Sequence, residues 1–201
     1  MPTPRSGGAS GVIDNKIYVA GGRPPGGHAF EAYDTATDTW EVLPNLPTQR
    51  NHLAATAIAG NIYVAGGRFG GGVGSEMTDT LEVYNPVTNL WTSGARMLKP
   101  RAGNNGIAAN GCFYVFGGEG NDPHPQGVFD ENEVYDPRTD SWQALEPIPT
   151  AVHGVTGAAF FNGWVHLPGG GIARGGSSGA RIHQMFQAVV DCTPSPFASG
   201  K

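Results

Sequence analysis

The sequence has few basic residues and no long apolar run, and both shortages exclude classes of protein. It has 201 residues with 12 Lys plus Arg against 17 Asp plus Glu, a formal net charge of −5, which offers no basic field to a nucleic-acid backbone. No apolar run approaches the roughly 18 residues of a transmembrane helix, and no signal peptide precedes Pro2. We therefore expect a soluble chain that binds neither nucleic acid nor membrane. Its compartment stays unknown, because an export signal could lie upstream of Met1.

Cysteine is scarce as well. Cys112 opens an apolar segment and Cys192 lies in a Pro/Ser-rich tail. This pair encodes neither a disulfide framework nor a CxxC metal site. We expect two free thiols, with Cys112 as a small buried hydrophobe.

Motifs of catalysis and of metal binding are missing too. The six histidines form no HExxH and no i, i+4 pair on a helix, so we expect no metal site. The chain contains no GxSxG and no GxxxxGK[ST], the motifs of a nucleophile elbow and a phosphate loop. We expect no cofactor and no catalytic constellation.

Glycine and proline are abundant, with 32 Gly and 16 Pro. Glycine exceeds twice its usual share of about 7%, so turns must be frequent and long helices scarce. The glycines lie between apolar segments that carry aromatic residues, and this pattern predicts an ordered all-β chain rather than disorder.

Four segments of the chain repeat one another: IYVAGGR (17–23), IYVAGGR (62–68), FYVFGGE (113–119) and WVHLPGG (164–170). Their Gly-Gly pairs begin at residues 21, 66, 117 and 169. The first three copies continue into EAYDTATDTW, EVYNPVTNLW and EVYDPRTDSW, whose tryptophans are Trp40, Trp91 and Trp142. A period near 50 residues with these features resembles the kelch repeat. In that family each repeat is one four-stranded blade of a β-propeller.

The resemblance implies a kelch-type β-propeller with four blades in an open arc or partial propeller. The repeats span about 1–45, 46–96, 97–147 and 148–187, and residues 188–201 form a Pro/Ser-rich tail that we expect to be frayed. We expect Tyr84 and Trp91 to pack between neighbouring sheets, because both recur in every full repeat. We expect the glycines after the second strand to meet a need for positive φ or close backbone approach.

The fourth repeat is incomplete, because no Trp follows residue 164. The blade therefore lacks its outer strand. A fragment of a longer propeller of about six blades and a natural four-bladed unit both agree with this pattern, and we favour the fragment. In either case an unpaired blade edge would favour self-association.

Candidate binding residues lie at one end of the predicted blades. The segments that lead into the first strands carry Arg5, Arg50 and Arg101, with His153 at the fourth equivalent place, and His52 and Asn104 follow closely. The loops after the second strands carry Arg23, Arg68, Glu119 and Arg174. The resemblance implies that Arg5, Arg50 and Arg101 grip acidic partners, since guanidinium groups bind carboxylates bidentately. The alternative is that each Arg is scaffold bonded to backbone carbonyls.

Two functions stay open at this point. We favour a non-catalytic binding or scaffold module whose loops bind a protein with an acidic segment, or a glycan. The alternative is an enzyme of the kind found among kelch propellers. A sialic acid mutarotase would use Glu119, Arg101 and His153 as acid, clamp and base. A galactose-oxidase-like protein is less consistent, because its copper ligands are missing.

Overall fold

The structure is a computed structural model that describes residues 1–154 and 157–194. It consists of four antiparallel sheets, one for each repeat. Blade 1 contains β1 (Ala9–Ile13), β2 (Lys16–Ala20), β3 (Phe30–Asp34) and β4 (Thr39–Val42). Blade 2 contains β5 (Ala54–Ile58), β6 (Asn61–Ala65), β7 (Leu81–Asn85) and β8 (Leu90–Ser93). Blade 3 contains β9 (Asn105–Ala109), β10 (Cys112–Phe116), β11 (Asn132–Asp136) and β12 (Ser141–Ala144).

Blade 4 is a three-stranded sheet of β13 (Ala159–Phe161), β14 (Trp164–Pro168) and β15 (His183–Gln187). The missing outer strand is as predicted. The helical part of the described chain is the short 3₁₀ turn η1 (Gly26–His28). No helix in residues 1–154 and 157–194 is long and apolar enough to cross a membrane.

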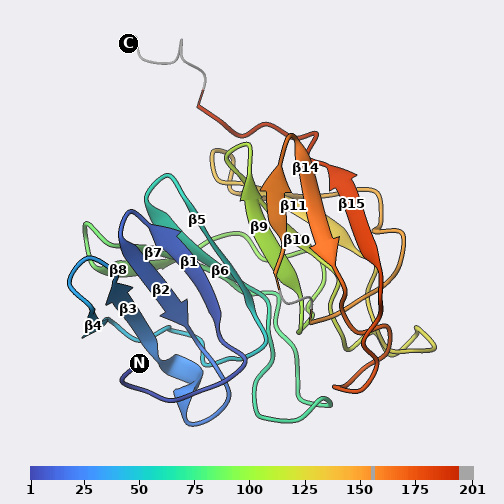
Figure 1. The fold of residues 1–201 in the computed structure, drawn as a ribbon, viewed down its shortest axis with the longest axis horizontal. Helices are drawn as coiled ribbons and strands as arrows, with labels where there is room; N and C mark the ends of the chain where they lie inside the picture. Colours follow the sequence, from blue (N-terminus) through green and yellow to red (C-terminus); the bar gives the residue numbers. More distant parts are fainter. Residues whose placement is uncertain (155–156, 195–201) are drawn as a thin grey trace.

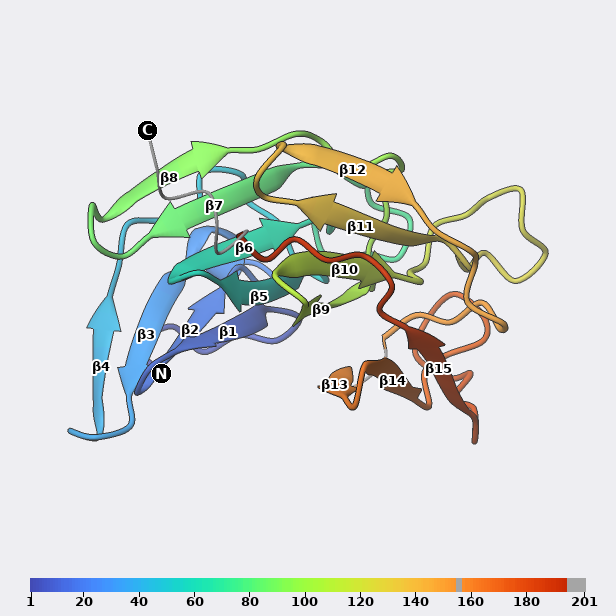
Figure 2. The ribbon, with the colours of Figure 1, turned by 90° about the horizontal axis from the view of Figure 1, so that it is seen from above.

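The four sheets form an arc, with the first strand of each blade on its inner side (Figure 2). The inner strands β1, β5, β9 and β13 contact one another in chain order, and blades 1 and 4 lie at the two ends of the arc. The predicted four blades in an open arc are confirmed. Each turn between the third and fourth strands is held by a short acceptor. In blade 1 the Asp34 carboxylate accepts bonds from the N–H groups of Ala36 and Thr37 at 2.9 and 3.2 Å, as an Asx turn does.

The recurring aromatic residues form the core between blades, as expected. The ring of Phe30 in blade 1 lies 4.7 Å from Tyr84 and 4.8 Å from Trp91 of blade 2, both edge-on. The Trp91 indole N–H then donates to Pro44 O of blade 1 at 2.9 Å. Trp142 repeats this bond to Ala95 O at 2.8 Å. Each indole therefore contributes apolar area and also joins its blade to the one before it.

The prediction of two free thiols is wrong. Cys112 at the start of β10 and Cys192 in the tail form a disulfide with Cα atoms 5.1 Å apart, and both residues are buried. The expected fraying is also wrong for residues 188–194, whereas residues 195–201 lie outside the described part. Figure 2 shows the tail leaving β15 and running back over β10 of blade 3, which no repeat pattern could reveal.

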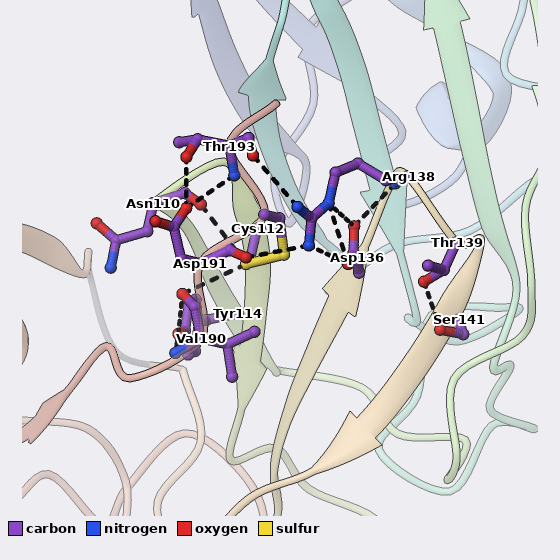
Figure 3. A network of polar contacts seen from close by, with 11 residues as sticks. Asn110, Cys112, Tyr114, Asp136, Arg138, Thr139, Ser141, Val190, Asp191 and Thr193 are labelled. Atoms are coloured by element: carbon purple, nitrogen blue, oxygen red, sulfur yellow. Dashed lines mark hydrogen bonds and ion pairs between the residues drawn. A yellow bond between two sulfur atoms is a disulfide. The ribbon is translucent and has the colours of Figure 1, made fainter. Parts of the chain in front are cut away.

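Polar contacts hold the tail on both sides of the disulfide (Figure 3). The Tyr114 hydroxyl donates to Val190 O at 3.2 Å and accepts from Val190 N–H at 3.0 Å. The Arg138 guanidinium donates to Asp191 O and Thr193 O at 3.0 and 3.2 Å. At the positions of Cys112 and Arg138, blade 2 has Asn61 and Val87, so blade 3 differs from its neighbour where it holds the tail.

The disulfide leads to a prediction for stability. We expect Cys192→Ser to lower the free energy of unfolding by about 2–4 kcal/mol, because the bridge no longer constrains a long loop in the unfolded chain. Thermal unfolding followed by circular dichroism measures this change. A reductant should lower the melting temperature of the wild type to that of the variant and leave the variant unchanged. A wild-type melting temperature that does not respond to complete reduction would contradict the prediction.

Candidate binding site at the loop end of the arc

Two sets of connections meet at one end of the arc. The segments that lead into the first strands pair with the loops that follow the second strands through single bridges, namely Asn51 with Arg68, Ala102 with Glu119 and His153 with Gly171. Figure 1 shows these loops together at the lower end of the sheets. We call this surface the loop end. It is the place where the sequence predicts a binding face.

Arg5, Arg50 and Arg101 do not form a rim there, because their side chains are at most 1% exposed and each pairs with a buried glutamate of its own blade. Arg101 binds the Glu133 carboxylate at 2.5 Å and donates to Gly117 O and Val115 O at 2.9 and 3.1 Å. Arg5 repeats this arrangement with Glu31, Gly21 O and Val19 O. Arg50 pairs with Glu82 and donates to Val64 O. A buried guanidinium with these partners is scaffold, so the expectation that the three arginines grip a partner is wrong.

In blade 4 the ion pair is replaced by neutral residues. The N–H of Gly118 donates to Val152 O, as the N–H of Gly67 donates to Arg101 O, both at 2.9 Å. Val152 therefore stands where the arginines stand, and placing His153 at that position was one residue off. The glutamate position is occupied by Gln184, which exchanges hydrogen bonds with the backbone of Thr150 at 2.6 and 3.0 Å. Blade 4 has lost both charges together, which avoids a buried charge without a partner.

Asn104 also belongs to the scaffold. It is buried, and its amide donates to Ala65 O at 3.4 Å. It lies against Gly66, where a Cβ atom would come within 2.8 Å of the Asn104 amide nitrogen. Gly66 has a φ of 65°, so both its conformation and its closeness to Asn104 require glycine.

A chain of backbone hydrogen bonds links the four blades at the loop end. His52 N–H donates to Gly7 O at 2.7 Å, Gly103 N–H to His52 O at 2.7 Å, and Gly154 N–H to Gly103 O at 2.8 Å. These residues have φ values of 69° at Gly7, 54° at His52, 63° at Gly103 and 58° at Gly154. Three of the four are glycine, so His52 is the one side chain on this line of equivalent positions.

His52 lies among polar groups from three blades. Its Nδ1 is 2.6 Å from Asn51 Oδ1 and its Nε2 is 3.3 Å from an Arg23 nitrogen, an arrangement that suits a neutral ring with its proton on Nδ1. Burial lowers the pKa of His52 to about 4, and the positive charges of Arg68 and Arg23 add to this effect. The charge of Glu119, which pairs with Arg68, acts in the opposite direction.

Arg68 and Glu119 form a buried ion pair at 2.5 Å that joins blade 2 to blade 3. The second oxygen of Glu119 accepts a bond from Gly175 N–H at 2.9 Å and lies 3.8 Å from His153 Nδ1. Burial would raise the pKa of Glu119, but the bond from Gly175 and the pair with Arg68 outweigh it and lower that pKa. Glu119 is thus an ionised carboxylate with both oxygens occupied.

Two open pockets adjoin this network. One, of about 270 Å³, is lined by His153, Ser178 and glycines of the loop after β14. The other, of about 280 Å³, is lined by Arg174, Asp122 and His124 among others, and Arg174 pairs with Asp122 at 2.6 Å. Arg23 is exposed at the same end. Of the predicted site residues, the structure therefore links Arg23, His52, Arg68, Glu119, His153 and Arg174 in one region, and in the described part it shows no cluster of three His, Cys, Asp or Glu side chains.

A sequence model of the KLHDC2/KLHL20/DRC7 Kelch-repeats domain matches residues 1–170. The chain belongs to the kelch-repeat family. Kelch-like protein terF of Aspergillus terreus is 30% identical over 93% of this kelch chain, and human Kelch-like protein 15 is 30% identical over 78% of it.

The kelch chain spans only 42% and 29% of the length of these two relatives. Among solved structures, that of YjhT superposes with a TM-score of 0.71 at 23% sequence identity, covering 86% of this chain and 60% of YjhT. At this identity the similarity shows the kelch propeller fold.

The buried ion pairs lead to a prediction about scaffold and charge. We expect Arg101→Val to lower the free energy of unfolding by about 3–5 kcal/mol, because Glu133 is left buried without a partner. The double variant Arg101→Val with Glu133→Gln copies blade 4 and should recover more than half of that loss. Urea unfolding of both variants and of the wild type measures the difference. A double variant no more stable than the single one would contradict this account.

His52 leads to a prediction about pH. In the unfolded chain its pKa returns towards 6.5, so the unfolded state binds the proton first and stability falls as the pH drops from 6.5 to about 4. We expect His52→Gly to reduce this slope. It should also raise the melting temperature at pH 7 by about 2–4 °C, because a positive φ costs a side-chain-bearing residue about 1 kcal/mol. Thermal unfolding between pH 4 and 7 tests both effects, and an unchanged slope would contradict the first.

Proposed function

We propose that this kelch chain is a non-catalytic binding module that captures a protein partner at its loop end, by a segment of the partner that carries carboxylates. The observation that carries the proposal is the position of Arg23. Its guanidinium is exposed and lies beside His52, with an Arg23 nitrogen 3.3 Å from His52 Nε2. A carboxylate that reaches this point meets a positive charge and a fork of N–H donors.

The state of the polar groups supports binding over catalysis. A mutarotase-like mechanism needs an acid or base that can exchange a proton with the substrate. Both oxygens of Glu119 are occupied by Arg68 and Gly175, and Arg101 is held in its own buried pair. His153 Nε2 lies 2.8 Å from Ala173 O, which accepts a hydrogen bond from the ring N–H. The three candidate groups thus have partners within the protein.

The loops after the second strands are suited to set specificity. They differ in sequence among the blades, with FGGGVGSE (69–76) in blade 2 and GNDPHPQG (120–127) in blade 3. Val73 at the tip of the first of these is 48% exposed. Loops of different sequence on a repeated scaffold are where binding residues usually lie. A glycan partner and self-association through a blade edge also stay predictions.

A peptide array tests the proposal. It pairs each carboxylate-bearing peptide with a copy in which Gln and Asn replace Glu and Asp. We expect the wild-type chain to retain members of the acidic set and to lose the matched amide copies, because the amides carry no charge. In the double variant Arg23→Ala with Arg174→Ala, the affinity for the retained peptides should fall about tenfold or more, which is a loss of about 1.4 kcal/mol of binding free energy.

The matched control is Lys16→Ala, which removes an exposed cation that pairs with Glu41 next to the β1–β2 turn, away from the loop end. It should leave binding unchanged. Equal retention of both peptide sets, or an equal loss in the control, would contradict the proposal. Anomer exchange of sialic acid followed by NMR is the matching test for catalysis, and we expect no acceleration over buffer.

A further inference from the structure

The outward face of blade 4 differs chemically from the corresponding faces of the other blades. Three residues before each Gly-Gly pair stands a residue that faces the following blade, and in blades 1 to 3 it is a buried tyrosine: Tyr18, Tyr63 and Tyr114. In blade 4 the same position holds His166. On the third strand, Phe30, Leu81 and Asn132 correspond to His183, and Ala32, Val83 and Val134 correspond to Met185. Two imidazoles and a thioether therefore replace mainly apolar core residues.

The three side chains lie on one face of the sheet. In the register of β14 and β15, His166 is directly opposite Met185 and Pro168 is opposite His183. The residues between them, Val165, Leu167 and Gln184, are buried on the other face. Residues directly opposite on antiparallel strands have Cβ atoms about 4.5–5.5 Å apart, so the Met185 thioether is within reach of the His166 ring.

The two imidazoles already contact each other. His166 Nδ1 lies 3.1 Å from His183 Nε2, and the rings stack with centroids 5.2 Å apart at 26°. A metal ion bound to two imidazoles has metal–nitrogen bonds of about 2.0–2.1 Å. For nitrogens 3.1 Å apart these bonds enclose an angle of about 95–100°, an ordinary value for two adjacent ligands. The ion takes the place of the proton in the hydrogen bond between the two rings. That proton moves to the other nitrogen of the ring that carried it, so no proton is released from the protein.

We propose that His166 Nδ1, His183 Nε2 and the Met185 thioether form a copper site on the exposed face of blade 4. Imidazole nitrogen binds several first-row ions, whereas a thioether selects the soft Cu(I) ion. Water completes the coordination, since the face is exposed: Met185 is 44% exposed. The site uses residues of the outward face alone and is independent of the function proposed for the loop end.

Titration of the 201-residue chain tests the site, with Cu(I) kept reduced by ascorbate in competition with a chromogenic chelator. Both cysteines are held in the disulfide, so no thiol competes for the ion. We expect one equivalent of Cu(I) to bind, and His166→Ala or His183→Ala to weaken it at least tenfold. Met185→Leu should weaken Cu(I) while leaving Cu(II) within about twofold, because the hard ion gains little from a thioether.

The matched control is His124→Ala, a histidine of the loop end, which should not change the titration. Circular dichroism checks that each variant is folded, which we expect because His183 and Met185 are exposed and His166 is only half-buried. Unchanged affinity in both histidine variants, or an equal loss in the control, would overturn the site. Loss in the histidine variants without any effect of Met185→Leu on Cu(I) would overturn the thioether ligand and with it the preference for copper.

Discussion

The buried pair between an arginine and a glutamate is the interaction on which each full blade depends. In blade 3 the Arg101 side chain ties three parts of the repeat together: the segment before the first strand, the carbonyl groups at the end of β10, and Glu133 on β11. Burying both charges costs desolvation free energy, and this cost is offset only when the guanidinium makes several hydrogen bonds with good geometry. The path of the chain around the Gly-Gly pair is therefore fixed by where this side chain must lie. Blade 4 reaches a similar path with Val152 and Gln184, which shows that the shape can be kept when both charges are removed together.

This use of arginine inside the blades decides what the loop end can do. Most of its positive charge is neutralised within the protein, and Arg68 is paired with Glu119 across a blade boundary. Two features remain. Arg23 is exposed, whereas the equivalent Arg68 is buried, and His52 stands where the other repeats have glycine. This surface combines variable loops with a line of backbone hydrogen bonds that links the blades. Such a surface recognises the shape of a partner and a few of its charges rather than a dense charge pattern.

The fold could be predicted from the sequence because its signals repeat. Gly-Gly, Tyr and Trp recur at a nearly constant spacing, and the lack of a Trp after residue 164 shows that the last repeat misses its outer strand. The site was harder to predict for the same reason. A recurring Arg50 or Arg101 looks alike whether it faces solvent or a buried glutamate, and only the register against Glu82 and Glu133 separates the two. His52 carried a usable signal, since it stands alone among glycines. The contacts of Cys192 and of His183 could not be predicted, because each joins segments with no shared pattern.

The bridge between Cys112 and Cys192 also changes how the molecule would carry a mechanical load. Blade 4 lies entirely inside the covalent loop that the bridge closes. A pull on the C-terminus is therefore transmitted through the sulfur atoms directly to β10, and the hydrogen bonds of β13, β14 and β15 bear none of it. With the bridge open, the same pull would first reach β15, the outer strand of the smallest sheet. One covalent bond thus determines whether force on this end of the chain is borne by a full blade or by the incomplete one.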